Sequence, residues 1–225
     1  MPTLHLLRVF CGEDGSGGNP LAVFLDGAEI PPDARQRVAE ELGLSETVFV
    51  DDAARGVIRI FTPAVELDFA GHPAVGTAWL LAERRAPVEA LRPTAGEAAV
   101  RYEDGAAFVS ARHDWGPPFE WTELSSPEEV EALDGPPGGH DLIGAWAWVD
   151  EPAGTVRARV FAVRVGVAED EATGSAATRL CLSLERPLEI HQGRGSIILA
   201  RPRADGYAEI GGRTVLDETA DHPLG

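Results

Sequence analysis

The sequence predicts an α+β protein made of two related halves, each a barrel-like, mostly antiparallel sheet around one central helix. Two observations support this fold class. Motifs of the first half recur in the same order about one hundred residues later, which indicates an internal duplication. Each half also contains one short helix of small, apolar residues, with strand-like segments on both sides. A helix that is apolar all round needs protein on every side, and the neighbouring strands can provide it.

The first half begins with two strands and a helix. LHLLRVF and LAVFL are typical of strands, and the glycine-rich GEDGSGGNP between them is typical of a turn. This turn lacks both G-x-x-x-x-G-K-[ST] and G-x-G-x-x-G, so we do not predict a phosphate site there. PPDARQRVAEELG is expected to be helical, because its prolines stand at the start, apolar residues recur every four positions and Gly43 follows as a stop.

The rest of the first half reads as two strands, a second helix and a hairpin. TVFV and VIRIF are strand candidates, and PAVGTAWLLAERR is a helix opened by Pro73. AAVRY and AAFVSA flank Asp104-Gly105, which is a strong hairpin turn.

Four pairs of segments indicate the duplication. They are SETVFVDD and AWAWVDE, VIRIF and VRARVF, Ala74–Ala78 and Ala172–Ala176, and the turns Asp104-Gly105 and Asp205-Gly206. The Gly-Pro-Pro break in RHDWGPPF separates the two halves, which we assign as residues 1–112 and 113–225. The last residues are candidates for packing back on the first half.

The two central helices are expected to be buried along their whole length, with only their ends free. A helix N-terminus presents unpaired N–H groups and a partial positive charge. Two such helices related by a pseudo-twofold axis would direct both N-termini at one cleft, which suits a substrate carboxylate. In this arrangement Gly71 lets a ligand approach the backbone, and His72 lies at the edge of the cleft. The loop Ala168–Glu171 would enter from the other side.

Composition excludes several classes of partner. The formal net charge is −18, with 37 acidic against 19 basic residues, so a nucleic acid would be repelled. Cys11 and Cys181 form no disulfide framework, and no apolar run is long enough to cross a bilayer. We therefore expect a cytoplasmic protein with no membrane partner. The histidines lack metal-ligand spacing, and we predict neither a metal nor a cofactor.

Five motifs, in this order along the chain, resemble the phenazine-biosynthesis isomerase family, the PhzF-like members of the diaminopimelate epimerase fold. They are GNPLAV (18–23), LGLSETVFV (42–50), FTPAVELDFAGHPAVGTA (61–78), AEDEATGSAA (168–177) and QGRGS (192–196). The resemblance implies proton-transfer chemistry between the halves. It places the general acid/base glutamate on Glu46, a histidine on His72 and an aspartate on Asp170. The substrate-binding positions that it implies are Asn19, Gly71, Gly174 and Ser175.

Without the resemblance, a purely structural role would be the simpler interpretation of these residues, and the resemblance outweighs it. Glu46 taken alone would be a solvated strand end, but the matching position of the repeat is Trp146, so the fold does not demand a carboxylate there. A glutamate in a closed apolar pocket has its pKa raised toward neutrality and can accept and return a proton. Ser175 lies in TGSA and not in G-x-S-x-G, so it is not expected to be a hydrolase nucleophile.

Two departures from the family pattern bear on the substrate. Glu171 replaces the usual proline, and we expect its charge to act on the protonation of Asp170. Little more than forty residues separate Pro117 from Phe161, so the pocket wall of the second half is expected to be reduced.

The leading function is a cofactor-independent isomerase of a small, carboxylated, unsaturated metabolite, as in secondary metabolism. One alternative is an amino-acid epimerase or racemase of the same fold, which usually needs a thiol at each of the two helix N-termini; neither Cys11 nor Cys181 matches that position. Another alternative is a non-catalytic protein that binds a small molecule. A homodimer is an option that the sequence leaves open.

Overall fold

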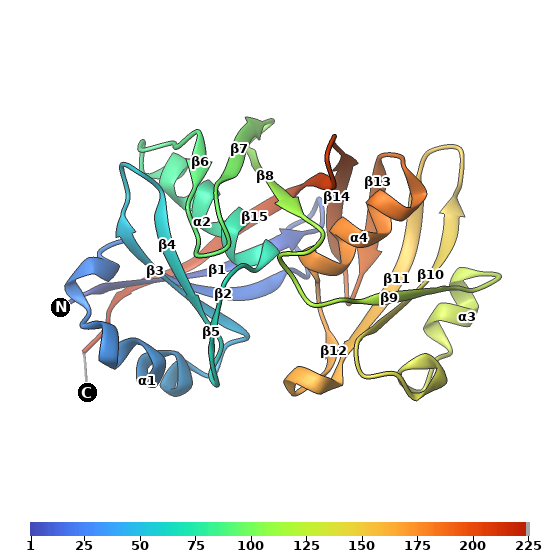
Figure 1. The fold of residues 1–225 in the computed structure, drawn as a ribbon, viewed down its shortest axis with the longest axis horizontal. Coiled ribbons are helices and arrows are strands. Elements are labelled where there is room, and N and C mark those ends of the chain that lie inside the picture. The colour runs from blue at the N-terminus through green and yellow to red at the C-terminus, as the bar shows by residue number, and fades with distance from the viewer. Residues whose placement is uncertain (224–225) are drawn as a thin grey trace.

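The strand-like segments pair into one continuous sheet that runs through two lobes (Figure 1). The computed structural model describes residues 1–223. The first part of the chain contains β1 (Thr3–Cys11), β2 (Asn19–Phe24), α1 (Pro32–Leu42), β3 (Glu46–Asp52), β4 (Val57–Phe61), β5 (Glu66–Leu67), α2 (Gly71–Glu83), β6 (Ala90–Leu91), β7 (Ala98–Glu103) and β8 (Ala106–Arg112). The second contains β9 (Glu120–Glu123), α3 (Pro127–Glu131), β10 (Ile143–Asp150), β11 (Thr155–Ala162), β12 (Val167–Asp170), α4 (Gly174–Leu184), β13 (Leu188–Gln192), β14 (Ser196–Pro202) and β15 (Tyr207–Asp221).

The last strand, β15, connects the lobes. The main path of the sheet is β5-β4-β3-β2-β1-β15-β14-β13-β11-β10-β9. Residues 207–212 of β15 pair with β8, and most of these also pair with β14, whereas residues 213–221 pair with β1. The N–H of His222 donates to the Pro2 carbonyl at 2.9 Å. The last strand therefore ends in the first lobe, next to the beginning of the chain (Figure 1).

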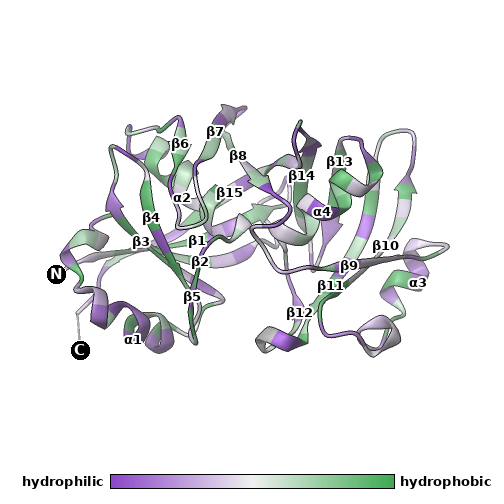
Figure 2. Cartoon of the chain, in the orientation of Figure 1, coloured by the Kyte–Doolittle hydropathy of each residue, from purple (hydrophilic) through white to green (hydrophobic). Residues whose placement is uncertain are grey.

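Local sequence signals set the helix and hairpin boundaries. α1 begins at Pro32 and ends before Gly43, which has a left-handed φ of 63° and donates its N–H to the Ala39 carbonyl. α1 buries Val38, Ala39 and the charged Arg35, which pairs with Asp51, and the helix is coloured largely hydrophilic in Figure 2. Asp104-Gly105 and Asp205-Gly206 all have positive φ values, between 50° and 77°. This is the type I′ geometry expected of Asp-Gly hairpin turns.

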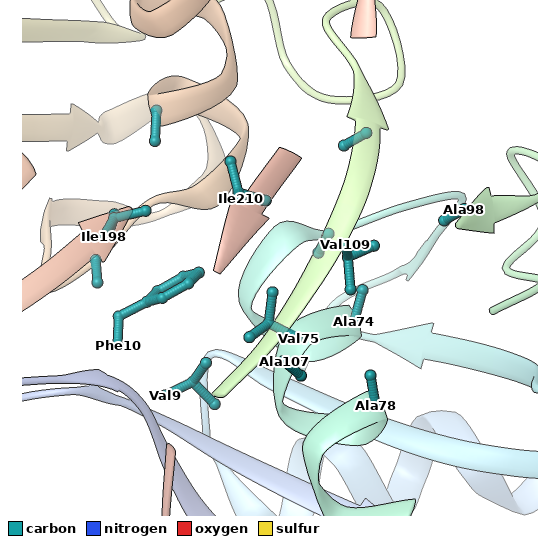
Figure 3. Packing of buried hydrophobic residues seen from close by; sticks show 14 of the residues in the cluster. Val9, Phe10, Ala74, Val75, Ala78, Ala98, Ala107, Val109, Ile198 and Ile210 are labelled. Carbon is teal, nitrogen blue, oxygen red and sulfur yellow. The ribbon is translucent and has the colours of Figure 1, made fainter. Parts of the chain in front are cut away.

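The first central helix, α2, is buried as the sequence predicts. Ten of its thirteen residues are buried. Figure 3 shows Ala74, Val75 and Ala78 of α2 among core residues of the surrounding strands, including Val9, Ala107 and Val109. Gly76 is required by packing, since a Cβ there would lie 2.6 Å from the Leu21 side chain and 2.7 Å from that of Val9. Small residues on α2 thus let the strands approach closely on all sides.

The second central helix, α4, differs from the expectation. Only six of its eleven residues are buried, and Arg179, Leu182 and Ser183 on its outer face are partly or fully exposed. The prediction that both central helices are buried along their whole length is wrong for α4. α2 packs against β1, β2, β3, β8 and β15, whereas α4 packs against β8, β14 and β15, so fewer strands surround α4.

The structure also corrects the register of the duplication. The turns after β3 and β10 are equivalent, because Asp52 pairs with Val57 and Asp150 with Thr155 across loops of the same length. With this register the counterpart of Glu46 is Gly144, and not Trp146. The helices start at Gly71 and Gly174, so Ala74–Ala78 does not match Ala172–Ala176. The segments between these elements differ in length in the two halves, so the residues that are structurally equivalent lie a few positions away from those that the sequence matched.

Candidate active site

Glu46 and His72 face each other at the start of β3 and α2. The imidazole Nε2 lies 3.3 Å from a carboxyl oxygen of Glu46, and the two side chains are 5% and 16% exposed. The contact lacks the angle of a hydrogen bond, so both atoms are buried without a hydrogen-bond partner in residues 1–223. Two enclosed polar atoms that are unsatisfied at the same place indicate a functional site.

Burial moves the two pKa values in opposite directions. It raises the pKa of Glu46 to about 7, and a hydrogen bond with Ser45 opposes the shift only partly. Burial lowers the pKa of His72 to about 4, against the charge of Asp170 and a hydrogen bond from the ring to the Pro20 carbonyl. Near pH 7 the site therefore holds a neutral imidazole beside a carboxyl group that can take up or release a proton.

The tautomer of His72 follows from its partners. Nε2 has no partner, so the nitrogen that donates to the Pro20 carbonyl is Nδ1. The neutral ring then carries its lone pair on Nε2, toward Glu46. His72 is accordingly oriented to accept a proton or a hydrogen bond.

Asp170 ends β12 and is held by side chains of both lobes. Asn19 Nδ2 donates to one carboxyl oxygen at 2.9 Å, and the Thr173 hydroxyl donates to the other at 2.6 Å. Burial nevertheless raises the pKa of Asp170, with nearby Glu46 adding to the shift. Asp170 interacts electrostatically with both His72 and Glu46, so the three residues that the sequence predicted as catalytic form one site.

Asn19 bridges the two lobes at this site. Its amide nitrogen also donates to the Ala172 carbonyl at 2.9 Å, and its amide oxygen accepts a hydrogen bond from the Ser45 hydroxyl at 3.3 Å. Ser45 directly precedes Glu46. One side chain of the first lobe therefore connects the residue before Glu46 to Asp170 and Ala172 of the second lobe.

Gly71 and Gly174 are required by contact between the two central helices. A Cβ on Gly71 would lie 2.8 Å from the Cα of Gly174, and one on Gly174 would lie 2.9 Å from the Cα of Gly71. Both would also meet the side chain of Ile210, on β15. Neither helix has a side-chain N-cap, so their first N–H groups are left free for another acceptor. The glycines thus bring the N-termini together, a reason that differs from the predicted approach of a ligand.

Ser175 is half-buried under the segment that joins the lobes. A Cβ on Gly116 would lie 2.5 Å from the Ser175 Cβ, which explains the glycine before Pro117 and Pro118. The joining segment therefore passes over the N-terminus of α4.

Glu171 does not act on Asp170 as expected. Its carboxylate accepts hydrogen bonds from the Arg194 N–H at 2.7 Å and the Ser196 hydroxyl at 2.9 Å. Ser196 Oγ in turn accepts the N–H of Gly18, the residue before Asn19. Glu171 thus fastens the β13–β14 turn and the glycine-rich loop, and it is absent from the groups that shift the pKa of Asp170.

Three residues of the site were missed by sequence reasoning. Ser45 and Thr173 were not singled out, although each directly precedes a predicted site residue. Gln192 begins the QGRGS motif, and its Nε2 donates to the Asp170 carbonyl at 2.8 Å and to the Thr173 hydroxyl at 3.0 Å. For Ser45 and Thr173, the available sequence signal was a small hydroxyl side chain directly before a predicted site residue.

Three cavities lie elsewhere in the molecule and are not lined by the three candidate catalytic residues. Their volumes are about 550 to 760 Å³, and none of them includes Glu46, His72 or Asp170. In residues 1–223 no group of three or more histidine, cysteine, aspartate or glutamate side chains is placed to hold a metal ion. Nor does any helix described here have both the length and the apolar character to span a bilayer.

Comparison with known proteins decides the family. The sequence profile of the phenazine biosynthesis-like protein family (PhzC-PhzF) matches residues 8–134. Trans-2,3-dihydro-3-hydroxyanthranilate isomerase of Pseudomonas fluorescens is 32% identical over 247 aligned residues, which cover 85% of this chain and 87% of that protein. This chain belongs to the PhzF-like family. It is an isomerase of that family, as its named relatives are.

Solved structures confirm the fold of this PhzF-like chain. A phenazine biosynthesis PhzC/PhzF protein from Clostridium difficile superimposes with a TM-score of 0.80 at 19% identity, covering 100% of both chains. A predicted epimerase from Pseudomonas aeruginosa superimposes with a TM-score of 0.74 at 26% identity, covering 99% of both chains. The predicted diaminopimelate epimerase-like architecture is therefore confirmed.

Proposed function

We propose that this PhzF-like protein moves a proton within a small, unsaturated carboxylate, with Glu46 as both base and acid. The observation that supports this most directly is the pair of unsatisfied atoms on Glu46 and His72, 3.3 Å apart in a buried site. The substrate class follows the named relative, which acts on trans-2,3-dihydro-3-hydroxyanthranilate.

In the proposed reaction the Glu46 carboxylate removes a proton from carbon, and the electron pair of that C–H bond enters the conjugated system. The resulting carboxylic acid then returns the proton to a carbon further along that system, so the product is an isomer and no other reactant is consumed. A carboxyl group with a pKa of about 7 suits both the removal and the return of the proton.

The surrounding groups stabilise the charge that develops. The free N–H groups of α2 and α4 meet beside Glu46 and His72, and helix N-termini favour a substrate carboxylate or an enolate-like oxygen. Neutral His72 can accept a hydrogen bond from an amino or hydroxyl group of the substrate through Nε2.

Thiol-based epimerisation is less well supported. Burial raises the pKa of Cys181 to about 12, and it raises that of Cys11 as well. Neither sulfur lies at a helix N-terminus, so the two-thiol arrangement of such an epimerase is not formed by these cysteines.

The test is proton exchange in deuterated water. The wild-type protein should introduce deuterium into a dihydro-hydroxyanthranilate-type substrate, and Glu46→Gln should lower this rate by a factor of about 10³ or more while remaining folded. Below pH 7 the wild-type kcat/KM should fall with an apparent pKa of about 7. Exchange that persists in a folded Glu46→Gln protein would assign the chemistry to another residue.

A further inference from the structure

We propose that the second lobe contains a separate binding site for a planar aromatic monocarboxylate. The site is a cavity of about 680 Å³ beside α4, a volume typical of small-molecule pockets. Arg179 of α4 lines it, five residues after Gly174, which corresponds to about 7.5 Å along the helix. None of Glu46, His72 and Asp170 lines this cavity.

Arg179 provides the anion-binding group. Elsewhere in this lobe, Arg157 pairs with Glu131 and Arg159 with Glu169. Arg179 has no hydrogen-bond or ion-pair partner in residues 1–223, and its Nε is enclosed without an acceptor. The side chains of other arginines, such as Arg55 and Arg194, also lack a carboxylate partner, but within residues 1–223 Arg179 is the arginine whose side chain has an enclosed nitrogen without an acceptor. Its planar guanidinium matches a carboxylate in a two-point hydrogen bond.

Aromatic side chains form the walls of the cavity. Phe119 and Trp146 are 6% and 4% exposed, so their rings are held by the core. Trp121 is fixed by a 3.1 Å hydrogen bond from its indole nitrogen to the Ala176 carbonyl. Gly144 makes room for this ring, because a Cβ there would lie 2.2 Å from it. Rigid aromatic walls favour a flat ring as the occupant.

The charge of the ligand is limited by its surroundings. Glu123 also lines the cavity and is exposed at its edge, and the whole chain has a net charge of −18. A single carboxylate can reach Arg179, whereas a second negative charge would face Glu123. This favours a monocarboxylate over a dicarboxylate or a phosphate.

This chain is shorter than a named relative, and one face of its α4 is uncovered. The alignment with the Pseudomonas fluorescens isomerase is 247 residues long although this chain has 225, so that relative has segments that this chain lacks. The outer face of α4, with Arg179, Leu182 and Ser183, is open, while α2 is covered.

The test uses 2-naphthoate as the probe and isothermal titration calorimetry as the measurement. We expect one saturable site in the wild-type protein, weakened at least tenfold by Arg179→Gln. Arg55→Gln, an exposed arginine on the β3–β4 turn, is the matched control and should leave the affinity unchanged. The neutral analogue 2-naphthamide should bind more weakly and should not respond to Arg179→Gln. Arg179→Lys, which keeps the charge but not the planar fork, should give an intermediate affinity.

Three results would overturn the proposal. The first is no saturable binding to the wild-type protein, and the second is wild-type affinity in a folded Arg179→Gln protein. The third is an affinity changed by Glu46→Gln, since that would place the probe in the active site. Thermal melting of each variant shows that it is folded, and the test does not depend on the isomerase reaction.

Discussion

The pKa shifts of Glu46 and His72 come from burial and not from a strong ion pair. Enclosure favours the uncharged form of each group, so it raises the pKa of the carboxyl group and lowers that of the imidazole. A charged pair would need the opposite shifts. The pair is thus held in a neutral state that a substrate can convert into a transient charged one.

This enclosure has a cost in stability that depends on pH. The pKa of Glu46 is about 7 in the folded protein and 4.5 as its ordinary value, so the folded state binds this proton more tightly. Wild-type stability is therefore lost as pH rises from about 4.5 to about 7, with the full cost above that range. At pH 8 we expect Glu46→Gln to exceed the wild type by up to about 3 kcal/mol in free energy of unfolding.

The difference in free energy of unfolding between Glu46→Gln and the wild type should shrink toward zero below pH 4.5. There Glu46 carries its proton in both the folded and the unfolded wild-type protein. Urea denaturation of both proteins at several pH values measures it. His72 is common to both proteins, so its own titration cancels in the comparison. Glu40→Gln, on the exposed face of α1, is the control and should show no such trend. A pH-independent difference would contradict the buried proton at Glu46.

At the level of elements, three loops hold the site in place. The β12–α4 loop follows Asp170 and begins with Glu171, the glycine-rich loop leads to Asn19, and the β13–β14 turn leads to Ser196. Asn19 joins the first two through Asp170, and Glu171 joins the third to them through Ser196 and Gly18. The acidic residue that replaces the usual proline is therefore a positioning residue.

Removing that carboxylate should loosen Asn19 and Asp170. We expect Glu171→Ala to cost about 1 to 3 kcal/mol of stability, since the buried Ser196 hydroxyl and the Gly18 N–H lose an organised partner. We also expect kcat/KM to fall about tenfold, because a misplaced site loses transition-state stabilisation. Steady-state kinetics and thermal melting measure both effects.

Glu171→Gln is the matched control, because its amide oxygen can still accept these hydrogen bonds. It should stay within about twofold of the wild type in kcat/KM. If the alanine and glutamine variants behave alike, charge and not hydrogen bonding is what matters at this position.

At the level of the whole molecule, the proposed function requires an acidic protein to bind an anion. The net charge of −18 repels an anionic substrate over long distances, whereas the N-termini of α2 and α4 attract it only at short range. Salt screens exposed charges beyond about 10 Å at ~0.1 M but affects a buried site much less. The two effects can therefore be separated by ionic strength.

Raising the salt concentration from low to moderate should increase kcat/KM for the anionic substrate or leave it unchanged, with kcat nearly constant. Stopped-flow or steady-state assays at fixed pH test this. A steep fall in kcat/KM would instead mean that a local basic surface steers the substrate, with Arg194 as the first candidate.

The sequence by itself determined the local structure, the family and the candidate site residues. Helix ends at Pro32 and Gly43, the Asp-Gly hairpins and the buried α2 follow from backbone preferences and from the spacing of apolar residues. The motifs around Glu46, His72 and Asp170 were found because each is short and contiguous. Signals of this kind act over a few residues, so they remain readable without the fold.

Only the tertiary structure decided which distant segments meet. The sequence matched the wrong residues of the two helices, because the register of the duplication depends on gaps that differ between the halves. It did not show that Gly71 lies against Gly174, that Glu171 points toward Ser196, or that one face of α4 is open. These outcomes depend on packing between segments up to about a hundred residues apart, and the spacing along a single strand or helix does not encode that packing.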